Sequence, residues 1–547
     1  MSRYKDRQYP QSTVFLLLIT AFLLIFSPWL SGLRELHWLE GNFALRALEM
    51  NFWIPVVQEY GQVIPYACPL YPFLAKILIH FGIPPEMALR VLSETALLLL
   101  ALLVYYTTKR NSNATAAAVA TAVLISSCIV IEKAMDGYPD TLTVLLIFIG
   151  QMLWFNYGAN RSDWNWAWIG FFAAVALAFY NGGLAAFLYA AFPLIFMRRP
   201  LSISHKLNKG GFYLALAIFG LLLFLWALPF WMQNGIVPFA ENNWNIPEWS
   251  DYLEHLVLFP LDAIWRFLPW TFLAWTPFCV AFQELDPTPI FSRFLRTLFI
   301  ALFALLWLSP FTDPRDFLYL APSLAILSGH NYYLLMCRYG GPLQKLLRPV
   351  PELIILAGGI ILFFYLIPQR WIGEWFADLH YRTEFFPQLY GVIIGCGCIL
   401  LGSWLWKRRG QAAIWVLLLV LSVAGSLFYW AIVHPYKSSR DDKRSFAQEV
   451  RTVLQADSPG KKPTVYLYGI RGLYAESVYL GVPVHKIRSL TELPGQEKTV
   501  YVFGAEYPRL PERRWVNLLP DFTYMNKRVS LWRGDLPEQK DSRDLGK

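Results

Sequence analysis

HWLEGNFALRALEM, residues 37–50, is the stretch around which the rest of the chain is organised. Phe43, Ala47 and Met50 recur in it at spacings of four and three residues, the periodicity of a helix with one apolar face. The stretch closely follows the first long apolar run and carries the carboxylate Glu40 near its start. We therefore expect a short amphipathic helix along a membrane surface. The alternative is that this helix only seals the bundle, with Glu40 as a favourable charge at the helix N-terminus.

The composition is that of a polytopic membrane protein. The chain has 547 residues, of which 56% are hydrophobic, and its mean hydropathy is +0.39. Apolar runs of about 18 residues recur along it, each long enough to span a bilayer as a helix. The formal net charge is +9, but the basic residues are spread over short loops between these runs, so we expect no nucleic-acid partner. The six cysteines do not have the spacing of metal ligands, and we expect neither a disulfide framework nor a cysteine-based zinc site.

We predict about thirteen membrane spans from these runs. They lie at about 13–31, 87–106, 114–131, 141–157, 165–180, 184–197, 211–232, 267–283, 297–311, 317–336, 352–367, 388–406 and 412–433. Residues 233–266 are expected to form a long polar loop. Lysine and arginine are concentrated in alternate loops, which places the N-terminus in the cytoplasm and the C-terminal region outside the cytoplasmic membrane.

The C-terminal residues 434–547 differ in character from the rest of the chain. They are polar and contain β-rich runs, preceded by a helical stretch at 440–454; the runs lie at 464–468, 499–503 and 528–532. We therefore predict an α-helical polytopic membrane protein with a small extracytoplasmic α/β C-terminal domain. Residues 1–433 would form the transmembrane domain and residues 434–547 the soluble one, in which we find no catalytic motif.

Three carboxylates in the first two predicted outward loops are the candidate catalytic groups: Glu40, Asp136 and Asp140. An ionisable group held at a membrane interface is costly and is therefore a functional candidate. Asp140 has an alternative role as the N-cap of the span that it directly precedes. Asp136 has one as a solvated turn residue in the sequence MDGYP.

These residues carry a resemblance to the GT-C superfamily of polytopic glycosyltransferases, and within it to bacterial aminoarabinose transferases and protein O-mannosyltransferases. The spacing of that family's first outward loop is kept by Glu40, Phe43, Ala44, Glu49 and Met50. Residues 82–106 resemble its arginine-containing second span, and Asp136 or Asp140 resembles the acidic residue of its second outward loop. RDFLYLAPSLAILSG, residues 315–329, resembles its arginine followed by Pro-x-Leu-Ala.

The chain also departs from the family pattern at three places. The first-loop aspartate falls on Leu39, the Glu-Lys-Pro motif on residues 67–69 (Ala-Cys-Pro), and the Lys-Gly pair on residues 181–182 (Asn-Gly). The glutamate of the second motif is linked to a metal in some members, so the sequence makes no cofactor certain and predicts no metal ligand. The absent lysines leave Arg315 as the clearest partner for a lipid phosphate; a local salt bridge with Asp313 or Asp316 is its alternative role.

The resemblance implies transfer of a sugar from a polyprenyl-phosphate donor to a lipid, glycan or protein acceptor at the outer face of the cytoplasmic membrane. An acceptor hydroxyl needs a general base, for which Asp140 ranks first, with Glu40 as its partner in one cavity and Asp136 as the substitute. The predicted substrate-binding residues are Arg315, Arg46, His37, Tyr66 and Tyr319. Two other functions stay open: a transporter or flippase for lipid-linked sugar, and a catalytically silent homologue.

Overall fold

The computed structural model describes most of the chain. The described residues are 9–31, 34–53, 56–64, 67–234, 248–367, 385–408, 412–438, 443–460, 463–470, 472–495, 497–505, 507–519, 522–524 and 527–536. They divide into two compact units: unit 1 is Met1–Arg34 with Arg90–Arg440, and unit 2 is Glu35–Leu89 with Asp441–Lys547. The predicted division of the chain between residues 433 and 434 stays a prediction.

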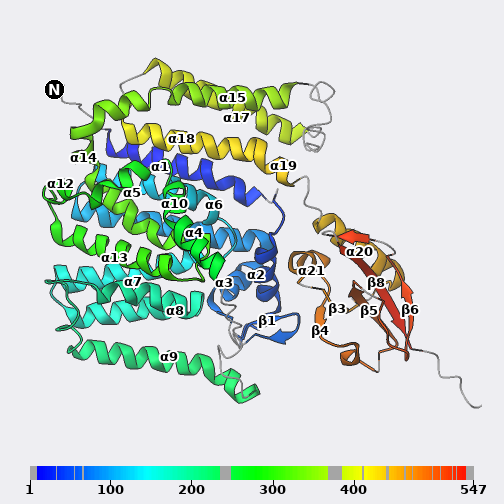
Figure 1. Cartoon of the computed structure of the whole chain (residues 1–547). Coiled ribbons are helices and arrows are strands. Elements are labelled where there is room, and N and C mark those ends of the chain that lie inside the picture. The colour runs from blue at the N-terminus through cyan, green and yellow to red at the C-terminus, as the bar shows by residue number, and fades with distance from the viewer. Residues whose placement is uncertain are drawn as a thin grey trace, which may run out of the picture. The chain divides into compact units, whose positions relative to one another are not determined.

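Unit 1 consists of helices (Figure 1). Their bounds are α1 (Gln11–Phe26), η1 (Ser27–Ser31), α4 (Pro85–Asn111, in this unit from Arg90), α5 (Ala114–Ser126), α6 (Cys128–Lys133), α7 (Asp140–Phe155), η2 (Asn156–Asn160), α8 (Trp164–Ile195), α9 (Gly210–Asn234), α10 (Trp249–Arg266), α11 (Thr271–Ala274), η3 (Thr276–Phe278), α12 (Val280–Gln283), α13 (Pro289–Leu308), η4 (Pro314–Leu320), α14 (Ala321–Leu346), α15 (Val350–Leu366), α17 (Phe385–Lys407), α18 (Ile414–Phe428), η7 (Tyr429–Val433) and α19 (His434–Ser438).

The described part of the chain holds eight helical segments long and apolar enough to cross a membrane, or nine if one bent pair is counted as a span. One of the eight, Pro314–Leu366, contains both α14 and α15, where the sequence predicts two spans. Further apolar helices are shorter, among them α1 and α5. The prediction of a helical polytopic membrane protein is thus confirmed, and the number of about thirteen spans stays a prediction.

The structure differs from the predicted spans in two regions. Two spans were expected on either side of residues 181–183; α8 runs through them as one element, but Gly183, with a non-helical φ of 66° that favours glycine, separates it into two helical parts at the predicted place. The prediction of a loop through residue 266 was wrong for its second half, because Trp249–Arg266 is the helix α10. The chain bends by 113° between that helix and Thr271–Phe278. The acidic residues that suggested a loop lie among regularly spaced apolar ones, and such an alternation is also compatible with an amphipathic helix.

The core of unit 1 fixes the start of α7. Helices α7 and α8 lie side by side (Figure 1), and the buried Trp154 on α7 stacks on Phe294 of α13 with ring centroids 6.0 Å apart. The amide of Asn181 on α8 donates to the carbonyl of Pro139 at 2.7 Å and to the hydroxyl of Thr143 at 2.8 Å. The first turn of α7 is therefore held by the neighbouring helix.

Unit 2 combines short helices with a small sheet. Its elements are α2 (Trp38–Glu49), β1 (Gln58–Glu59), β2 (Gln62–Val63), α3 (Leu70–His80), α20 (Lys443–Asp457), β3 (Val465–Tyr468), α21 (Tyr474–Leu480), β4 (Val484–Ile487), η8 (Leu490–Glu492), β5 (Thr499–Gly504), β6 (Arg514–Asn517), β7 (Phe522–Tyr524) and β8 (Lys527–Asp535). The sheet order is β4-β3-β5-β8-β6, with β7 also paired to β8. Strand β3 is parallel to β4 and β5, whereas β8 is antiparallel to β5 and β6. The predicted helix 37–50, the three predicted strands and the helix before them are confirmed.

The first predicted outward loop shares a core with the C-terminal region, which the sequence did not predict. Leu45 and Tyr60 lie in the same buried cluster as Phe446 and Leu531. Helices α2 and α21 approach so closely that a Cβ on Gly41 would lie 2.4 Å from a backbone nitrogen of α21. Unit 2 is therefore a single packed body made from two segments that are far apart in sequence.

Candidate functional site

Arg315 is placed by the local structure of η4. The Asp313 carboxylate accepts a hydrogen bond from the Arg315 backbone N–H at 3.0 Å, and the Asp316 carboxylate accepts one from the Asp313 N–H at 2.8 Å. This reciprocal pair, with Pro314 at the first position, is a capping box. Both neighbouring carboxylates thus bond the backbone, and the ion pairs of the Arg315 side chain are made with residues of another segment instead.

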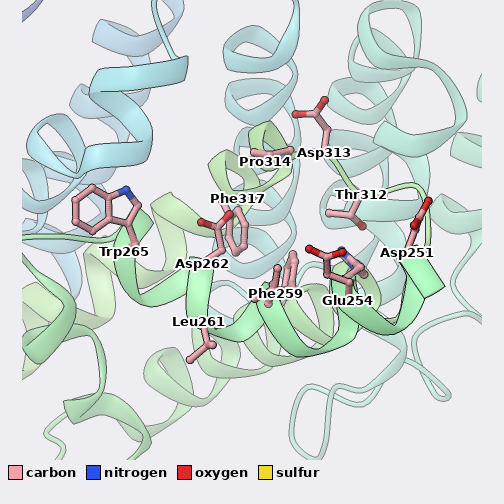
Figure 2. A pocket seen from close by; sticks show the side chains of 12 residues that line it. Asp251, Glu254, Phe259, Leu261, Asp262, Trp265, Thr312, Asp313, Pro314 and Phe317 are labelled. Atoms are coloured by element: carbon pink, nitrogen blue, oxygen red, sulfur yellow. The ribbon is translucent and has the colours of Figure 1, made fainter. Parts of the chain in front are cut away.

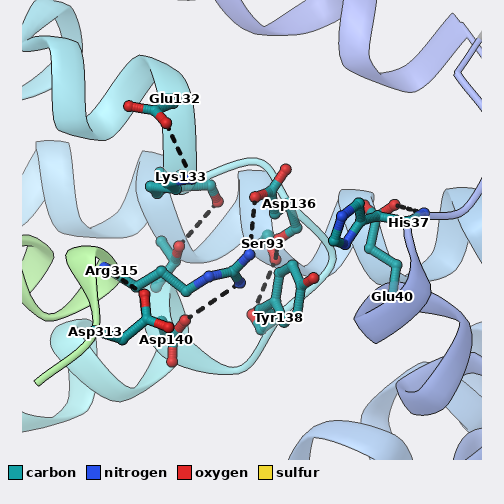
Figure 3. A network of polar contacts seen from close by, with 12 residues as sticks. His37, Glu40, Ser93, Glu132, Lys133, Asp136, Tyr138, Asp140, Asp313 and Arg315 are labelled. Carbon is teal, nitrogen blue, oxygen red and sulfur yellow. Dashed lines mark hydrogen bonds and ion pairs between the residues drawn. The ribbon is translucent and has the colours of Figure 1, made fainter. Parts of the chain in front are cut away.

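The Arg315 guanidinium lies among three residues of the second predicted outward loop (Figure 3). Its Nη2 is 3.3 Å from Oδ2 of Asp136, and its Nη1 is 3.8 Å from Oδ2 of Asp140. Its Cζ lies 3.5 Å from the centroid of the Tyr138 ring, within the range of a cation–π interaction. The structure therefore brings together Arg315, Asp136 and Asp140, three of the residues that the sequence singled out.

The two carboxylates differ in environment. The Asp136 side chain is 7% exposed, and its second oxygen, Oδ1, accepts a hydrogen bond from Arg34 Nη1 at 3.0 Å. The Asp140 side chain is 26% exposed, and at 3.8 Å its contact with Arg315 is too long for a hydrogen bond. Asp136 is thus covered and bound by two guanidinium groups, whereas Asp140 is the more exposed of the two carboxylates.

The segment between these two aspartates is a tight turn leading into α7. The backbone N–H of Tyr138 donates to the Asp136 carbonyl at 2.6 Å, and the Ser93 hydroxyl on α4 donates to the carbonyls of both residues at 3.3 Å. Helix α7 begins at Asp140 with Pro139 as its N-cap, and no side-chain capping bond is present there. Asp140 is therefore not an N-cap, although the helix dipole favours a carboxylate in this first turn. The role of Asp136 as a solvated turn residue is also wrong.

Tyr319 lies close to Asp140. Its phenol lies within electrostatic range of the carboxylates of Asp140 and Asp316. Its ring contacts that of Tyr189 on α8, with centroids 4.7 Å apart. The predicted substrate-binding residue Tyr319 thus belongs to the same cluster as Arg315.

The other predicted site residues belong to unit 2. Glu40 is fully buried and accepts a hydrogen bond from the His37 backbone N–H at 2.8 Å, completing a capping box at the start of α2 (Figure 3). The Arg46 guanidinium bonds the Glu59 carboxylate through Nη2 at 2.8 Å and Nε at 3.0 Å. These contacts are structural. The catalytic role of Glu40, the substrate-binding roles of His37 and Arg46, and the cavity expected to join Glu40 to Asp140 stay predictions. Tyr66 lies outside the described residues.

A cavity of about 640 Å³ lies between α10 and the start of η4 (Figure 2). The titratable residues that line it are Asp251, Glu254, His255, Asp262 and Asp313. No lysine or arginine is among its lining residues within the described structure. Because a phosphate needs cations or N–H donors, this acidic cavity does not suit the phosphate of a lipid donor.

We searched the described residues for side chains that could bind a metal ion together. Among the described residues, no three or more His, Cys, Asp or Glu side chains are grouped as metal ligands would be. The site is therefore described by its arginines, carboxylates and tyrosines alone.

Sequence reasoning missed two members of the cluster, Arg34 and Tyr138. Arg34 follows the first span as one scattered basic residue of an outward loop, and Tyr138 lies between the two candidate aspartates. The position of Tyr138 inside MDGYPD was the available signal for that residue. For Arg34 the sequence holds no such signal, because its partner Asp136 lies 102 residues away.

Comparisons with known proteins concern the fold of the chain. Residues 66–230 match the family described as dolichyl-phosphate-mannose-protein mannosyltransferase. ArnT from Cupriavidus metallidurans bound to undecaprenyl phosphate superposes with a TM-score of 0.68 at 15% identity, covering 96% of this chain and 98% of that one. The apo state of ArnT gives a TM-score of 0.66 at 16% identity, covering 95% and 98%. No curated protein matches the chain. The chain therefore has the fold of ArnT over nearly its whole length, and the resemblance to GT-C glycosyltransferases is confirmed at the level of the fold.

Proposed function

We propose that the protein is an integral-membrane glycosyltransferase. It moves a sugar from a polyprenyl-phosphate donor to a lipid, glycan or protein acceptor at the outer face of the cytoplasmic membrane. One observation carries this proposal: a single guanidinium, that of Arg315, lies beside a covered carboxylate, Asp136, and a more exposed one, Asp140. Such a cluster offers a cation to a phosphate and a base to a hydroxyl in one place.

Arg315 is the proposed partner of the donor phosphate. Its Nη1 is buried and has no hydrogen-bond partner among the described residues, and Oδ2 of Asp140 lies 3.8 Å from it. A buried donor without an acceptor costs about 1–3 kcal/mol, which a phosphate oxygen or a closer approach of Asp140 would recover. The ArnT structure bound to undecaprenyl phosphate supports a polyprenyl phosphate as the lipid.

Asp140 is the proposed general base. Its carboxylate accepts the proton of the acceptor hydroxyl while the hydroxyl oxygen attacks the anomeric carbon of the sugar. The bond between that carbon and the phosphate oxygen breaks, and both of its electrons leave with the polyprenyl phosphate. The new glycosidic bond forms on the opposite face of the sugar, so the configuration is inverted.

The leaving group needs no proton in this scheme. Negative charge grows on the phosphate as the glycosidic bond breaks, and a positioned guanidinium stabilises that charge. Tyr138 and Asp136 keep Arg315 in place, since the ring packs against Cζ and the carboxylate binds Nη2. Tyr319 lies beside Asp140 and is the proposed contact for a substrate hydroxyl.

Transfer of label tests the proposal. Purified protein is incubated with radiolabelled polyprenyl-phosphate pentoses and hexoses and with a membrane extract as the acceptor source. Label that appears in an acceptor with wild-type protein, and does not appear there with Asp140→Asn protein, supports the proposal that the protein is a glycosyltransferase. If lipid-linked sugar moves between the leaflets of a vesicle and no label is transferred, the protein is a flippase instead.

A further inference from the structure

Two arginines bind the two oxygens of one carboxylate in unit 1. Nη1 of Arg34 lies 3.0 Å from Oδ1 of Asp136, and Nη2 of Arg315 lies 3.3 Å from Oδ2. With Asp136 ionised, the three side chains together carry one net positive charge, which attracts an anion.

Helix α4 fixes the backbone on both sides of this cluster. The side chain of Arg90, which is 1% exposed, donates from Nη1 to the Arg34 carbonyl at 3.0 Å. Ser93 donates to the carbonyls of Asp136 and Tyr138. Residues 90 and 93 are three apart on a helix and so lie on one face. One face of α4 therefore sets where Arg34 and Asp136 meet before any substrate binds.

The positively charged side chains of the cluster are more exposed to solvent than the negatively charged one. The Arg34 and Arg315 side chains are 20% and 15% exposed, whereas that of Asp136 is 7% exposed. The two arginine side chains are therefore more exposed than the carboxylate that both of them bind. This order of exposure favours a site for an anion over an ion-pair network that only holds loops together.

We propose that Arg34 is a second phosphate-binding residue, and that Asp136 is a positioning residue that holds Arg34 and Arg315 together. This inference rests on the proposed function and extends its phosphate site from one cation to two. The donor is a phosphodiester with one negative charge, whereas the polyprenyl phosphate released by transfer is a monoester that carries up to two. A second guanidinium therefore acts most strongly on the charge that develops as the sugar leaves.

The test measures binding and transfer separately. Polyprenyl phosphate is titrated into purified full-length protein at pH 8, with the uncharged polyprenol and with inorganic phosphate as parallel probes. We expect Arg34→Gln to weaken binding of polyprenyl phosphate by about tenfold and to leave polyprenol binding unchanged. Inorganic phosphate alone should bind weakly, because it lacks the lipid; tight binding of free phosphate would identify a soluble anion as the ligand and overturn the proposal.

The kinetics of sugar transfer test whether Arg34 stabilises the negative charge that develops on the phosphate as the sugar leaves. Arg34→Gln should lower kcat more than it raises the KM for donor, and Arg34→Lys should recover part of the loss. The matched control is Arg266→Gln, since Arg266 also bridges two carboxylates, Glu132 and Asp262, but does not contact Asp136. The control should keep wild-type binding and kinetics.

A double variant separates a cation for phosphate from a cation that only neutralises Asp136. Arg34→Gln leaves a covered carboxylate without one partner, and Asp136→Asn in the same protein removes that charge. The double variant is compared with Asp136→Asn alone, because loss of Asp136 also loosens Arg315. Binding of polyprenyl phosphate that is weaker in the double variant than in Asp136→Asn supports Arg34 as a phosphate ligand, and equal binding by the two overturns the proposal. If Arg34→Gln binds normally while Arg315→Gln does not, only this inference fails; if the wild-type protein binds no polyprenyl phosphate, the proposed function fails too.

Discussion

Nη1 of Arg315 lies 3.8 Å from Oδ2 of Asp140, although the two residues belong to different helices, η4 and α7. At this distance the charges attract each other without a hydrogen bond, so this contact uses no N–H donor of Arg315 and no acceptor of Asp140. A cation and a partly exposed carboxylate are thus available side by side. This relationship, rather than any single motif, is the basis of our proposal that a phosphate and a hydroxyl bind at the same site.

Replacement of Arg315 by lysine tests the phosphate contact. Lysine keeps the positive charge but loses the planar fork that binds an oxyanion through two N–H groups. We expect Arg315→Lys to raise the apparent KM for the lipid-linked donor by about tenfold. Arg266→Lys is the control. An unchanged KM for donor in folded Arg315→Lys protein would rule out a direct contact between this side chain and the phosphate.

The direction of the chain across the membrane can be tested with reporter fusions. The distribution of lysine and arginine predicts a cytoplasmic N-terminus and an outward C-terminal region. A reporter that is active only outside the cytoplasm should work when fused after residue 440 and should not work after residue 203. The reverse pattern would place the loop that carries Asp136 and Asp140 on the cytoplasmic side and contradict the proposed site of transfer.

Because α2 packs closely on α21, we predict that adding one methyl group between them lowers the stability of the protein. In Gly41→Ala the new Cβ would lie 2.4 Å from the Ala475 backbone nitrogen, so one helix must shift. Overpacking of this kind costs about 1–3 kcal/mol, seen as a lower melting temperature of the purified protein. Gly425→Ala on α18 is the control, because no atom lies within 4 Å of the added Cβ. Equal melting temperatures for both variants would contradict the packing of unit 2.

Glu49 predicts a pH dependence of stability. Burial raises the pKa of Glu49 above its ordinary value of 4.5, against the lowering effects of the Gly61 N–H and His485. As the pH rises above 4.5, the unfolded chain loses this proton before the folded one does, so the Glu49 contribution to stability falls. Glu49→Gln should therefore gain melting temperature relative to wild type between pH 4 and pH 7.5. The exposed Glu512→Gln should show no such gain, and parallel curves for Glu49→Gln and wild type would contradict the shift.

Much of the fold follows from local patterns. The helix 37–50, the strands of the C-terminal sheet and most apolar helices were predicted, because periodicity and run length report on local structure. The helix α10 was missed because its acidic residues were interpreted as a loop, although the apolar residues between them recur at a spacing that is compatible with a helix. The joining of residues 35–89 to the C-terminal region was also missed, since contacts such as that between Gly41 and Ala475 depend on tertiary packing.

The candidate site was predicted in part. The resemblance to GT-C enzymes pointed to Arg315 and to an aspartate of the second loop, and the structure brings both together. Which aspartate is covered depends on Arg34, whose ion pair crosses 102 residues of sequence and leaves no local pattern. The difference in environment between Asp136 and Asp140 therefore could not be predicted from the sequence.

The most direct measurement is sugar transfer by purified wild-type protein and its Asp140→Asn variant, with radiolabelled polyprenyl-phosphate sugars and a membrane extract as acceptor. Asparagine keeps the shape of the side chain and removes the proton acceptor. The account predicts label transfer by wild type and a loss of about two orders of magnitude in Asp140→Asn, with binding of polyprenyl phosphate retained. Asp163→Asn, which alters the N-cap of α8, is the control and should transfer normally. Folded Asp140→Asn protein that transfers at the wild-type rate, or wild-type protein that transfers none of the sugars, would contradict the account.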